Sequence, residues 1–178
     1  MMPIYEFEGK QPKIAKTAFV FPSADVIGDV TIGENCFIGP NAVLRGDWGH
    51  IKVGNGSNIQ DACVLHSIPD GGTILDEDCH IGHGAIVHQA ELGKHVLVGK
   101  NAVIMNWAKI GDDCVIGSGC VVPQKKVIEA GNLVLGVPGK VVGKVSEDQK
   151  NYSLNATKLY QTLPKRYHNS LKLLKHNY

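Results

Sequence analysis

A six-residue spacing of aliphatic side chains constrains this chain more than any other feature. The spacing recurs from Val20 to Val134, interrupted by DWGHIK (residues 47–52), by HSIPDGGTI (residues 66–74) and by one deleted position before Leu92. An amphipathic helix spaces apolar residues by three and four, and an alternating strand spaces them by two. A fixed period of six therefore predicts short strands separated by turns, with three hexads closing one triangular coil.

Stacked coils of this kind predict an all-β fold, a parallel β-helix over residues 1–145 that includes an N-terminal strand segment. An ordinary antiparallel sheet with coincidental spacing is the alternative, and the many in-phase matches disfavour it. Ser146 and Gln149 then have the spacing of a helix capping box. Apolar residues follow at intervals of three and four, at Leu159, Leu163, Tyr167, Leu171 and Leu174. We expect residues 146–178 to form an amphipathic helical segment along the coils, kinked or split at Pro164.

Composition excludes several classes of function. The formal net charge is +1, and no basic stripe with interleaved aromatic residues is present, so neither nucleic acid nor a membrane surface is an expected partner. No apolar run approaches the roughly 20 residues that cross a bilayer, and the N-terminus does not read as a secretory signal. The chain has five cysteines, an odd number with no close pairs, which predicts reduced, mostly buried thiols in a cytoplasmic protein.

Three histidines occupy special positions in the repeat. His66 follows the inward residue Leu65, and His88 follows the inward residue Val87, so both imidazoles fall on one face in adjacent coils. Neighbouring strands lie about 4.8 Å apart, which lets both rings bind one ion. His83 belongs to the preceding side of the triangle and points around a corner. A neighbouring subunit can therefore complete a three-histidine metal site, and a homotrimer is the natural closed assembly.

Three histidine ligands leave a fourth position for water. Zinc, or alternatively ferrous iron or cobalt, lowers the pKa of such a water toward neutrality and makes it a nucleophile. The spacing therefore predicts a metal-dependent enzyme. A surface or hydrogen-bonded role is the alternative for any one histidine taken alone.

Three segments carry a specific resemblance to a known family: LRGDWG (residues 44–49), NIQDACVLH (58–66) and IGHGAIVH (81–88). Over about residues 10–145 the chain is similar to the gamma-class carbonic anhydrase-like proteins, which are left-handed parallel β-helices of hexapeptide repeats. The resemblance implies that His66 and His88 bind the metal from one subunit and that His83 comes from the next.

The same resemblance implies further site residues. It assigns catalytic or structural roles to Arg45 and Asp47 and to Gln60 and Asp61. Arg45 and Asp61 can form an ion pair across adjacent coils, and Gln60 can bind the metal-bound water or an oxyanion. A purely structural role at the subunit contact is the alternative for the charged residues. Tyr152 and Asn155 match a family tyrosine and asparagine near the metal.

Within this family, the N-terminus, the LRGDWGHIKV segment and the NYSLNATKLYQTL tail resemble phenylacetate-pathway and carnitine-operon members, which are linked to thioester hydrolysis and CoA metabolism. The loop HSIPDGG replaces the acidic loop of the best carbon dioxide hydrating members, and Asp70 is its one carboxylate.

Three functions follow as alternatives. The first is a lyase or hydrolase that uses metal-bound hydroxide on carbon dioxide or on an acyl-CoA thioester. The second is a hexapeptide-repeat acyltransferase, which needs one general-base histidine and a CoA groove, with Lys125 and Lys126 as candidate phosphate contacts. The third is a scaffold that keeps the metal for trimer stability. Metal analysis and a panel of substrates distinguish them.

Overall fold

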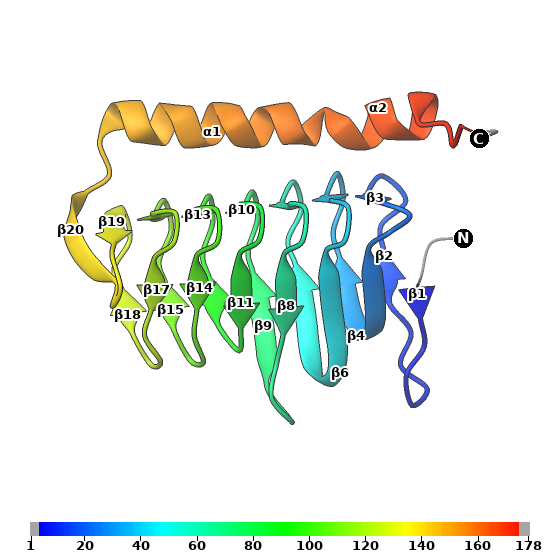
Figure 1. The fold of residues 1–178 in the computed structure, drawn as a ribbon, viewed down its shortest axis with the longest axis horizontal. Coiled ribbons are helices and arrows are strands. Elements are labelled where there is room, and N and C mark those ends of the chain that lie inside the picture. The colour runs from blue at the N-terminus through cyan, green and yellow to red at the C-terminus, as the bar shows by residue number, and fades with distance from the viewer. Residues whose placement is uncertain (1–3, 175–178) are drawn as a thin grey trace.

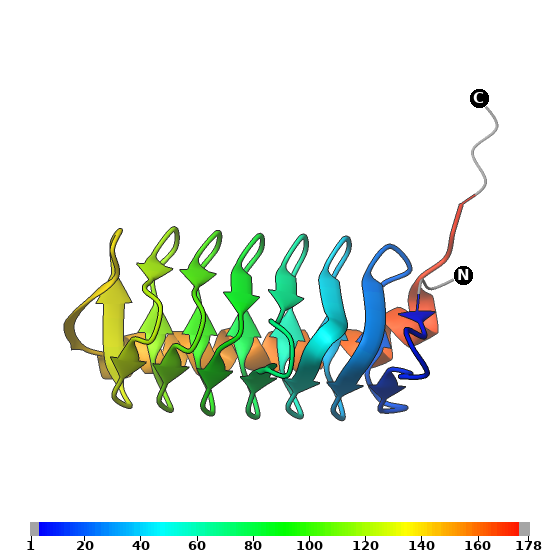
Figure 2. The ribbon, with the colours of Figure 1, turned by 90° about the horizontal axis from the view of Figure 1, so that it is seen from below.

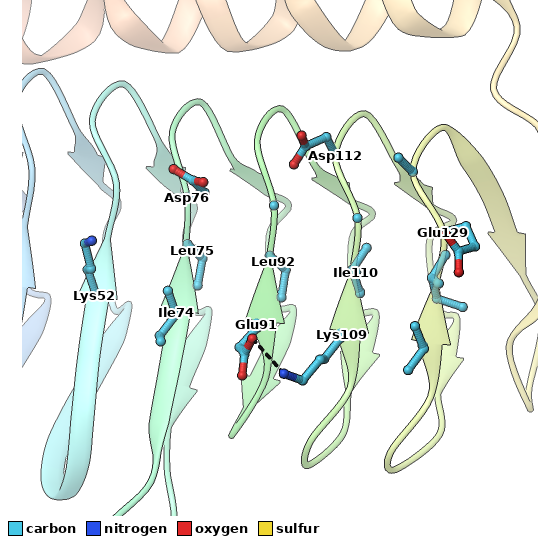
Figure 3. Close-up of a pocket in the computed structure, with 15 residues that line it drawn as sticks. Lys52, Ile74, Leu75, Asp76, Glu91, Leu92, Lys109, Ile110, Asp112 and Glu129 are labelled. Atoms are coloured by element: carbon cyan, nitrogen blue, oxygen red, sulfur yellow. Dashed lines mark hydrogen bonds and ion pairs between the residues drawn. The ribbon is translucent and has the colours of Figure 1, made fainter.

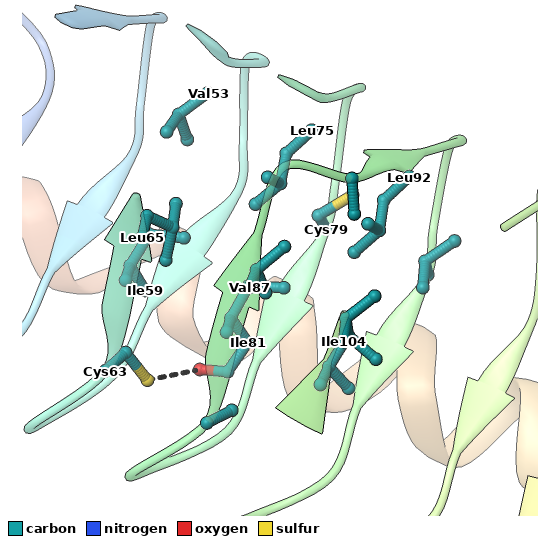
Figure 4. Packing of buried hydrophobic residues seen from close by; sticks show 14 of the residues in the cluster. Val53, Ile59, Cys63, Leu65, Leu75, Cys79, Ile81, Val87, Leu92 and Ile104 are labelled. Carbon is teal, nitrogen blue, oxygen red and sulfur yellow. Dashed lines mark hydrogen bonds between the residues drawn. The ribbon is translucent and has the colours of Figure 1, made fainter. Parts of the chain in front are cut away.

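The repeat forms a parallel β-solenoid of about seven turns in the computed structural model, which describes residues 4–174 (Figure 1). Residues 1–3 and 175–178 of the two expected segments lie outside the described residues. Every aliphatic position of the hexad series is buried, and the side chains of successive coils stack in the interior (Figure 4). These positions are Val20, Val26, Ile32, Ile38, Leu44, Val53, Ile59, Leu65, Leu75, Ile81, Val87, Leu92, Val98, Ile104, Ile110, Ile116, Val122, Ile128 and Val134. The predicted fold class is confirmed.

The solenoid has three faces, and we name the first the helix face because the C-terminal helices cover it. Its strands pair in parallel, coil upon coil, apart from the last strand of the sheet, β20. The strands of the helix face are β3 (Phe19–Val20), β5 (Phe37–Ile38), β7 (Asn58–Ile59), β10 (His80–Ile81), β13 (Leu97–Val98), β16 (Val115–Ile116) and β19 (Asn132–Leu135).

The other two faces belong to one twelve-stranded sheet, because β4 (Asp25–Ile32) and β6 (Val43–Val53) run continuously around the corner between them. The histidine face consists of the first halves of these two strands followed by β8 (Val64–His66), β11 (Ile86–His88), β14 (Val103–Ile104) and β17 (Val121–Val122). The charged face consists of their second halves followed by β9 (Gly72–Leu75), β12 (Glu91–Leu92), β15 (Lys109–Ile110) and β18 (Val127–Ile128).

Both ends of the sheet system are closed by additional strands. At the N-terminal end, β1 (Ile4–Tyr5) and β2 (Lys13–Ile14) pair with β4. At the other end, β20 (Lys140–Lys144) pairs antiparallel with β19 and turns the chain back. The returning chain forms two helices that run the length of the solenoid toward its N-terminal end, as two views show (Figures 1 and 2).

The two helices are α1 (Glu147–Gln161) and α2 (Leu163–Ser170), with Pro164 in the first turn of the second. The predicted capping box is confirmed, because the Ser146 hydroxyl accepts from the Gln149 backbone N–H and the Gln149 side chain accepts from the Ser146 N–H. The split at Pro164 is also confirmed.

The predicted apolar stripe of the helices is partly wrong. Leu163 and Tyr167 are partly buried, but Leu159 is 69% exposed, and Leu171 and Leu174 lie beyond the end of α2 and are exposed. Tyr167 of the predicted stripe docks on the helix face, together with Ser153, Thr157, Tyr160 and Pro164, which the stripe did not include. Small polar residues at the contact let α1 lie close to the sheet, where the tyrosines pack against Phe37.

The five cysteines are unpaired and buried, as predicted. Burial raises the pKa of the Cys36 thiol to about 12 and that of Cys63 to about 11, so these thiols are protonated at neutral pH. Among the described residues no helix has the length and hydropathy that crossing a membrane requires.

Candidate functional site

The centre of the candidate site is a pair of imidazoles on the histidine face. His66 and His88 are register partners on β8 and β11, as the repeat predicts. Their rings approach to 3.1 Å between His66 Nδ1 and His88 Nε2. His66 is 6% exposed and His88 is partly buried. The repeat therefore brings two imidazole nitrogens to one point.

Each ring of this pair has an oxygen acceptor on its other nitrogen. His66 Nε2 lies 3.0 Å from Asp47 Oδ1, and His88 Nδ1 lies 3.1 Å from Asn106 Oδ1. A carboxylate and an amide oxygen both require an N–H donor, which assigns the ring protons to these outer nitrogens. In neutral rings the two inner nitrogens that face each other are then both unprotonated, and each presents a lone pair.

The surroundings of His66 favour its neutral form. Burial lowers the pKa of His66 below its ordinary value, and the hydrogen bond to Asp47 offsets this only in part. Burial also raises the pKa of Asp47, but the bonds from Arg45 and His66 outweigh it and lower that pKa below its ordinary value. Arg45 Nη1 lies 2.6 Å from Asp47 Oδ2. Asp47 is therefore an ionised acceptor that fixes the tautomer of His66.

His83 has the same kind of partner at the corner between the helix face and the histidine face. Its Nδ1 lies 2.8 Å from Asp61 Oδ2, and Asp61 comes from the corresponding corner of the preceding coil. Asp61 accepts the Nδ1 proton, so Nε2 of a neutral His83 carries the free lone pair. All three histidines thus have an oxygen acceptor that holds one nitrogen and leaves the other available.

This donor set fits a divalent metal ion. Histidine ligands usually donate their second N–H to a carboxylate or carbonyl group. In a tetrahedral site with metal–nitrogen distances of about 2.0–2.1 Å, ligand nitrogens lie about 3.3 Å apart, close to the 3.1 Å between His66 and His88. Within residues 4–174 of a single chain, no three His, Cys, Asp or Glu side chains gather in a way that can hold a metal. One chain therefore brings two imidazoles together, and His83 does not join them to form a group of three, as the sequence predicts.

Other expected contacts differ from the structure. Arg45 pairs with Asp47 rather than with Asp61, whose partner is His83, because Arg45 lies on the histidine face and Asp61 lies at its corner with the helix face. The predicted ion pair between Arg45 and Asp61 is therefore not formed within the described part of one chain. Gln60 is buried and makes its hydrogen bonds inside its own chain.

Tyr152 and Asn155 lie on α1, over a different face from the histidine pair. Tyr152 is 73% exposed and Asn155 is exposed too. Both residues are accessible to a neighbouring subunit, but one chain alone does not bring them to His66 and His88. Their assignment to the site stays a prediction.

Sequence reasoning missed two residues beside the imidazole pair. Asn106 holds His88, and its position two residues after the inward Ile104, one coil beyond Val87, is the signal that could have identified it. Trp48 follows Asp47 and packs against the His66 ring with centroids 5.5 Å apart, yet it is 57% exposed. An exposed tryptophan beside the imidazoles forms an apolar rim to the site.

Comparisons with known proteins agree with this architecture. Residues 11–46 and 89–124 match a family described as bacterial transferase hexapeptide (six repeats), and residues 29–67 match the hexapeptide repeat of succinyl-transferase. The carnitine operon protein CaiE of Escherichia coli K12 is 45% identical over 170 residues, which cover 96% of this chain and 87% of CaiE.

Solved structures are also similar. A Bacillus cereus protein provisionally described as an acetyltransferase superposes with a TM-score of 0.92 at 33% identity, covering 94% of this chain and 98% of its own. A hexapeptide transferase family protein from Anaplasma phagocytophilum gives 0.89 at 33% identity, with coverage of 93% and 98%.

Fold and site together define a β-solenoid protein of hexapeptide repeats with paired histidines on one face. The chain belongs to the hexapeptide-repeat transferase family and is similar to CaiE. These comparisons favour acyl transfer or thioester chemistry, which the sequence allowed as an alternative, over the hydration of carbon dioxide.

Proposed function

We propose that the protein is an enzyme that transfers the acyl group of a CoA thioester to water, at a site formed by His66 and His88 of one subunit and His83 of the partner subunit. The observation that supports this most directly is the arrangement of acceptors around the imidazoles. Asp47, Asn106 and Asp61 each hold one ring nitrogen and leave the other free for a divalent ion, with zinc first and ferrous iron or cobalt as alternatives.

A divalent ion with three histidine ligands activates water and polarises a carbonyl oxygen. The chain's own residues prepare that site. Asp47 keeps the proton on His66 Nε2, and Arg45 keeps Asp47 ionised. The Arg45 side chain is 41% exposed, which leaves some of its N–H donors accessible to an anionic group of the substrate. Trp48 supplies apolar surface beside His66.

The proposal includes a homotrimer. The site needs a second copy, because His83 is not beside the pair in its own chain. Closed rings of identical subunits are the usual way to present one residue of each copy to the next. Five unpaired, buried thiols favour a cytoplasmic location in this proposal.

A second candidate is acyl transfer to an amine or hydroxyl acceptor. The hydrogen bond between His66 and Asp47 favours it, because a carboxylate-oriented imidazole is the usual general base of such a reaction. The similarity to the Bacillus cereus protein also favours it. Hydration of carbon dioxide is a third reaction that the same metal site can perform.

Metal content and substrate tests discriminate among these functions. We expect protein purified without added metal to contain about one divalent ion per chain. Release of free thiol from acyl-CoA substrates should stop on chelation and return on adding the metal. Metal-free protein whose thiol release ignores chelators, and rises only with an amine acceptor, would establish the second candidate instead. A carbon dioxide hydration assay on the same sample measures the third reaction.

Mixed trimers test the shared site. His66→Ala and His83→Ala proteins should each lack metal. After unfolding and joint refolding at equal amounts, about a quarter of the sites should bind metal, because half have an intact pair and half of those meet an intact His83. Equal metal loss in the mixture and in the single variants would contradict a site shared between chains.

A further inference from the structure

Both polar atoms of the Gln60 carboxamide form hydrogen bonds to neighbouring residues of the same chain. Gln60 is 2% exposed. Its Oε1 accepts from the His83 backbone N–H at 3.2 Å, and its Nε2 donates to Asn58 Oδ1 at 3.0 Å and lies 2.7 Å from His80 Nε2. A backbone N–H can only donate, so the contact with His83 fixes the orientation of the amide. The expected role of Gln60 as a donor to a bound water is therefore not available within one chain.

His80 supplies the acceptor for the second amide proton. It lies on β10 under α1, with its ring edge-on to Tyr160 at a centroid distance of 5.3 Å. Its Nδ1 lies 3.3 Å from Asn58 Nδ2 and 3.5 Å from the Thr157 hydroxyl of α1. Burial lowers the pKa of His80 to about 4, so the ring is neutral at neutral pH. A neutral ring accepts at one nitrogen only, and the shorter of its two amide contacts, 2.7 Å to Gln60 Nε2 against 3.3 Å to Asn58 Nδ2, assigns the acceptor to Nε2.

The corner that carries His83 is bonded to both neighbouring coils: the Gly84 N–H donates to Asp61 O, and the Asn101 N–H donates to His83 O. Gly82 and Gly84 flank His83, and Gly84 has φ of +72°, a conformation that glycine adopts at no steric cost. Asp61 holds the ring of His83 and Gln60 holds its main chain. Two consecutive residues of the preceding coil, Gln60 and Asp61, therefore act with these main-chain bonds to position the imidazole.

We propose that His80 is a positioning residue that, through Gln60, connects the docked helix α1 to the His83 corner. This inference rests on the proposed metal site, because it gives α1 a part in presenting the ligand that the partner subunit receives. When α1 is in place, Thr157 and Tyr160 hold the His80 ring. His80, together with Asn58, in turn keeps the Gln60 amide in the orientation that binds the His83 main chain.

Replacing His80 by phenylalanine or glutamine separates shape from hydrogen bonding. His80→Phe keeps a flat ring against Tyr160 but removes one of the two acceptors of the Gln60 amide group, leaving Asn58 Oδ1. His80→Gln keeps an acceptor oxygen. Leu97→Ala is the matched control, since Leu97 is the register neighbour of His80 in the next coil and does not contact Gln60.

Metal affinity of the intact assembly, measured by chelator competition, is the first readout. We expect His80→Phe to weaken it about tenfold, as loss of an outer partner of a metal ligand typically does. His80→Gln should remain within about threefold of the unaltered protein and Leu97→Ala should be unchanged. Equal affinity in His80→Phe and in the unaltered protein would overturn the inference.

Hydrogen exchange of the peptide that contains residues 82–84 is a second readout and needs no metal. Exchange should be faster in His80→Phe, but not in His80→Gln or Leu97→Ala. Unchanged exchange in His80→Phe overturns the positioning role whatever the metal result. If the unaltered protein binds no metal, the proposed function fails, and this exchange difference still decides whether His80 holds the corner.

Discussion

The histidine face and the charged face have the same backbone and the same buried aliphatic residues, but their outer side chains differ. On the histidine face the register stacks Asp25, Val43, Val64, Ile86, Val103 and Val121, a row that is apolar after its first member. On the charged face the corresponding row is Thr31, Lys52, Ile74, Glu91, Lys109 and Val127. There Lys109 Nζ binds Glu91 Oε2 at 3.1 Å (Figure 3).

The difference shows how one repeat supplies two kinds of surface. A partly exposed apolar row beside the imidazole pair favours an interaction surface, whereas paired charges suit contact with water. A hollow of about 620 Å³ lies on the charged face, lined by Lys52, Asp76, Glu91, Lys109 and Asp112 among others. It holds no imidazole. We therefore assign the proposed reaction to the histidine face, where a second copy of the chain can cover it.

Removing one imidazole should have the largest effect. We expect His88→Ala to lose the metal and to reduce thioester hydrolysis to background, because His66 alone cannot hold the ion. Glu91→Ala, three residues on and across the corner, is the control and should keep both. Elemental analysis and thiol release measure the outcome, and stoichiometric metal in His88→Ala would contradict the assignment.

A charge in the apolar row should break the assembly. Ile86 is 38% exposed in the single chain, and the proposed trimer buries it. Ile86→Asp places a carboxylate in that contact, so we expect monomers by sedimentation. Ile74→Asp, the same change in the outer row of the charged face, should leave the oligomer intact. If both variants form the same oligomer, the outer row of the histidine face does not lie in the subunit contact.

Acid should destabilise the protein through His80 on the helix face. This covered face serves as a reference for the histidine face and the charged face, which the helices do not cover. Burial lowers the pKa of His80 from 6.5 to about 4. Between these values the unfolded chain binds more protons, so stability falls as pH drops from about 6.5 to about 4, by at most about 3 kcal/mol for this group. Below pH 4 the loss is complete. Urea unfolding at several pH values should show a shallower decline in His80→Phe, and parallel curves would contradict this account.

The smallest effect is expected for the ion pair of the charged face. Lys109 and Glu91 are both more than half exposed, so their pair is weak in water and is screened by salt. Lys109→Ala should change the free energy of unfolding by less than about 1 kcal/mol. It should leave metal content and assembly unchanged. A larger loss in urea unfolding would mean that this face carries more of the stability than its exposure implies.

The sequence predicted the coil architecture because each hexad is a local pattern with one inward residue. The same frame placed His66 and His88 side by side and His83 around the corner, since register in stacked coils follows from counting residues. It also gave the capping box of α1 and the break at Pro164. Each of these features depends on residues that are near in sequence or fixed in phase by the repeat.

Only the tertiary structure decided which side chains meet across separate segments. It paired Arg45 with Asp47 and Asp61 with His83, docked α1 through Ser153 and Thr157, and brought Thr157 to His80, 77 positions away in sequence. Such contacts depend on how closely a helix lies on a sheet and on which of several acceptors a donor reaches. No periodicity encodes those distances, so the partners of the histidines had to be seen in three dimensions.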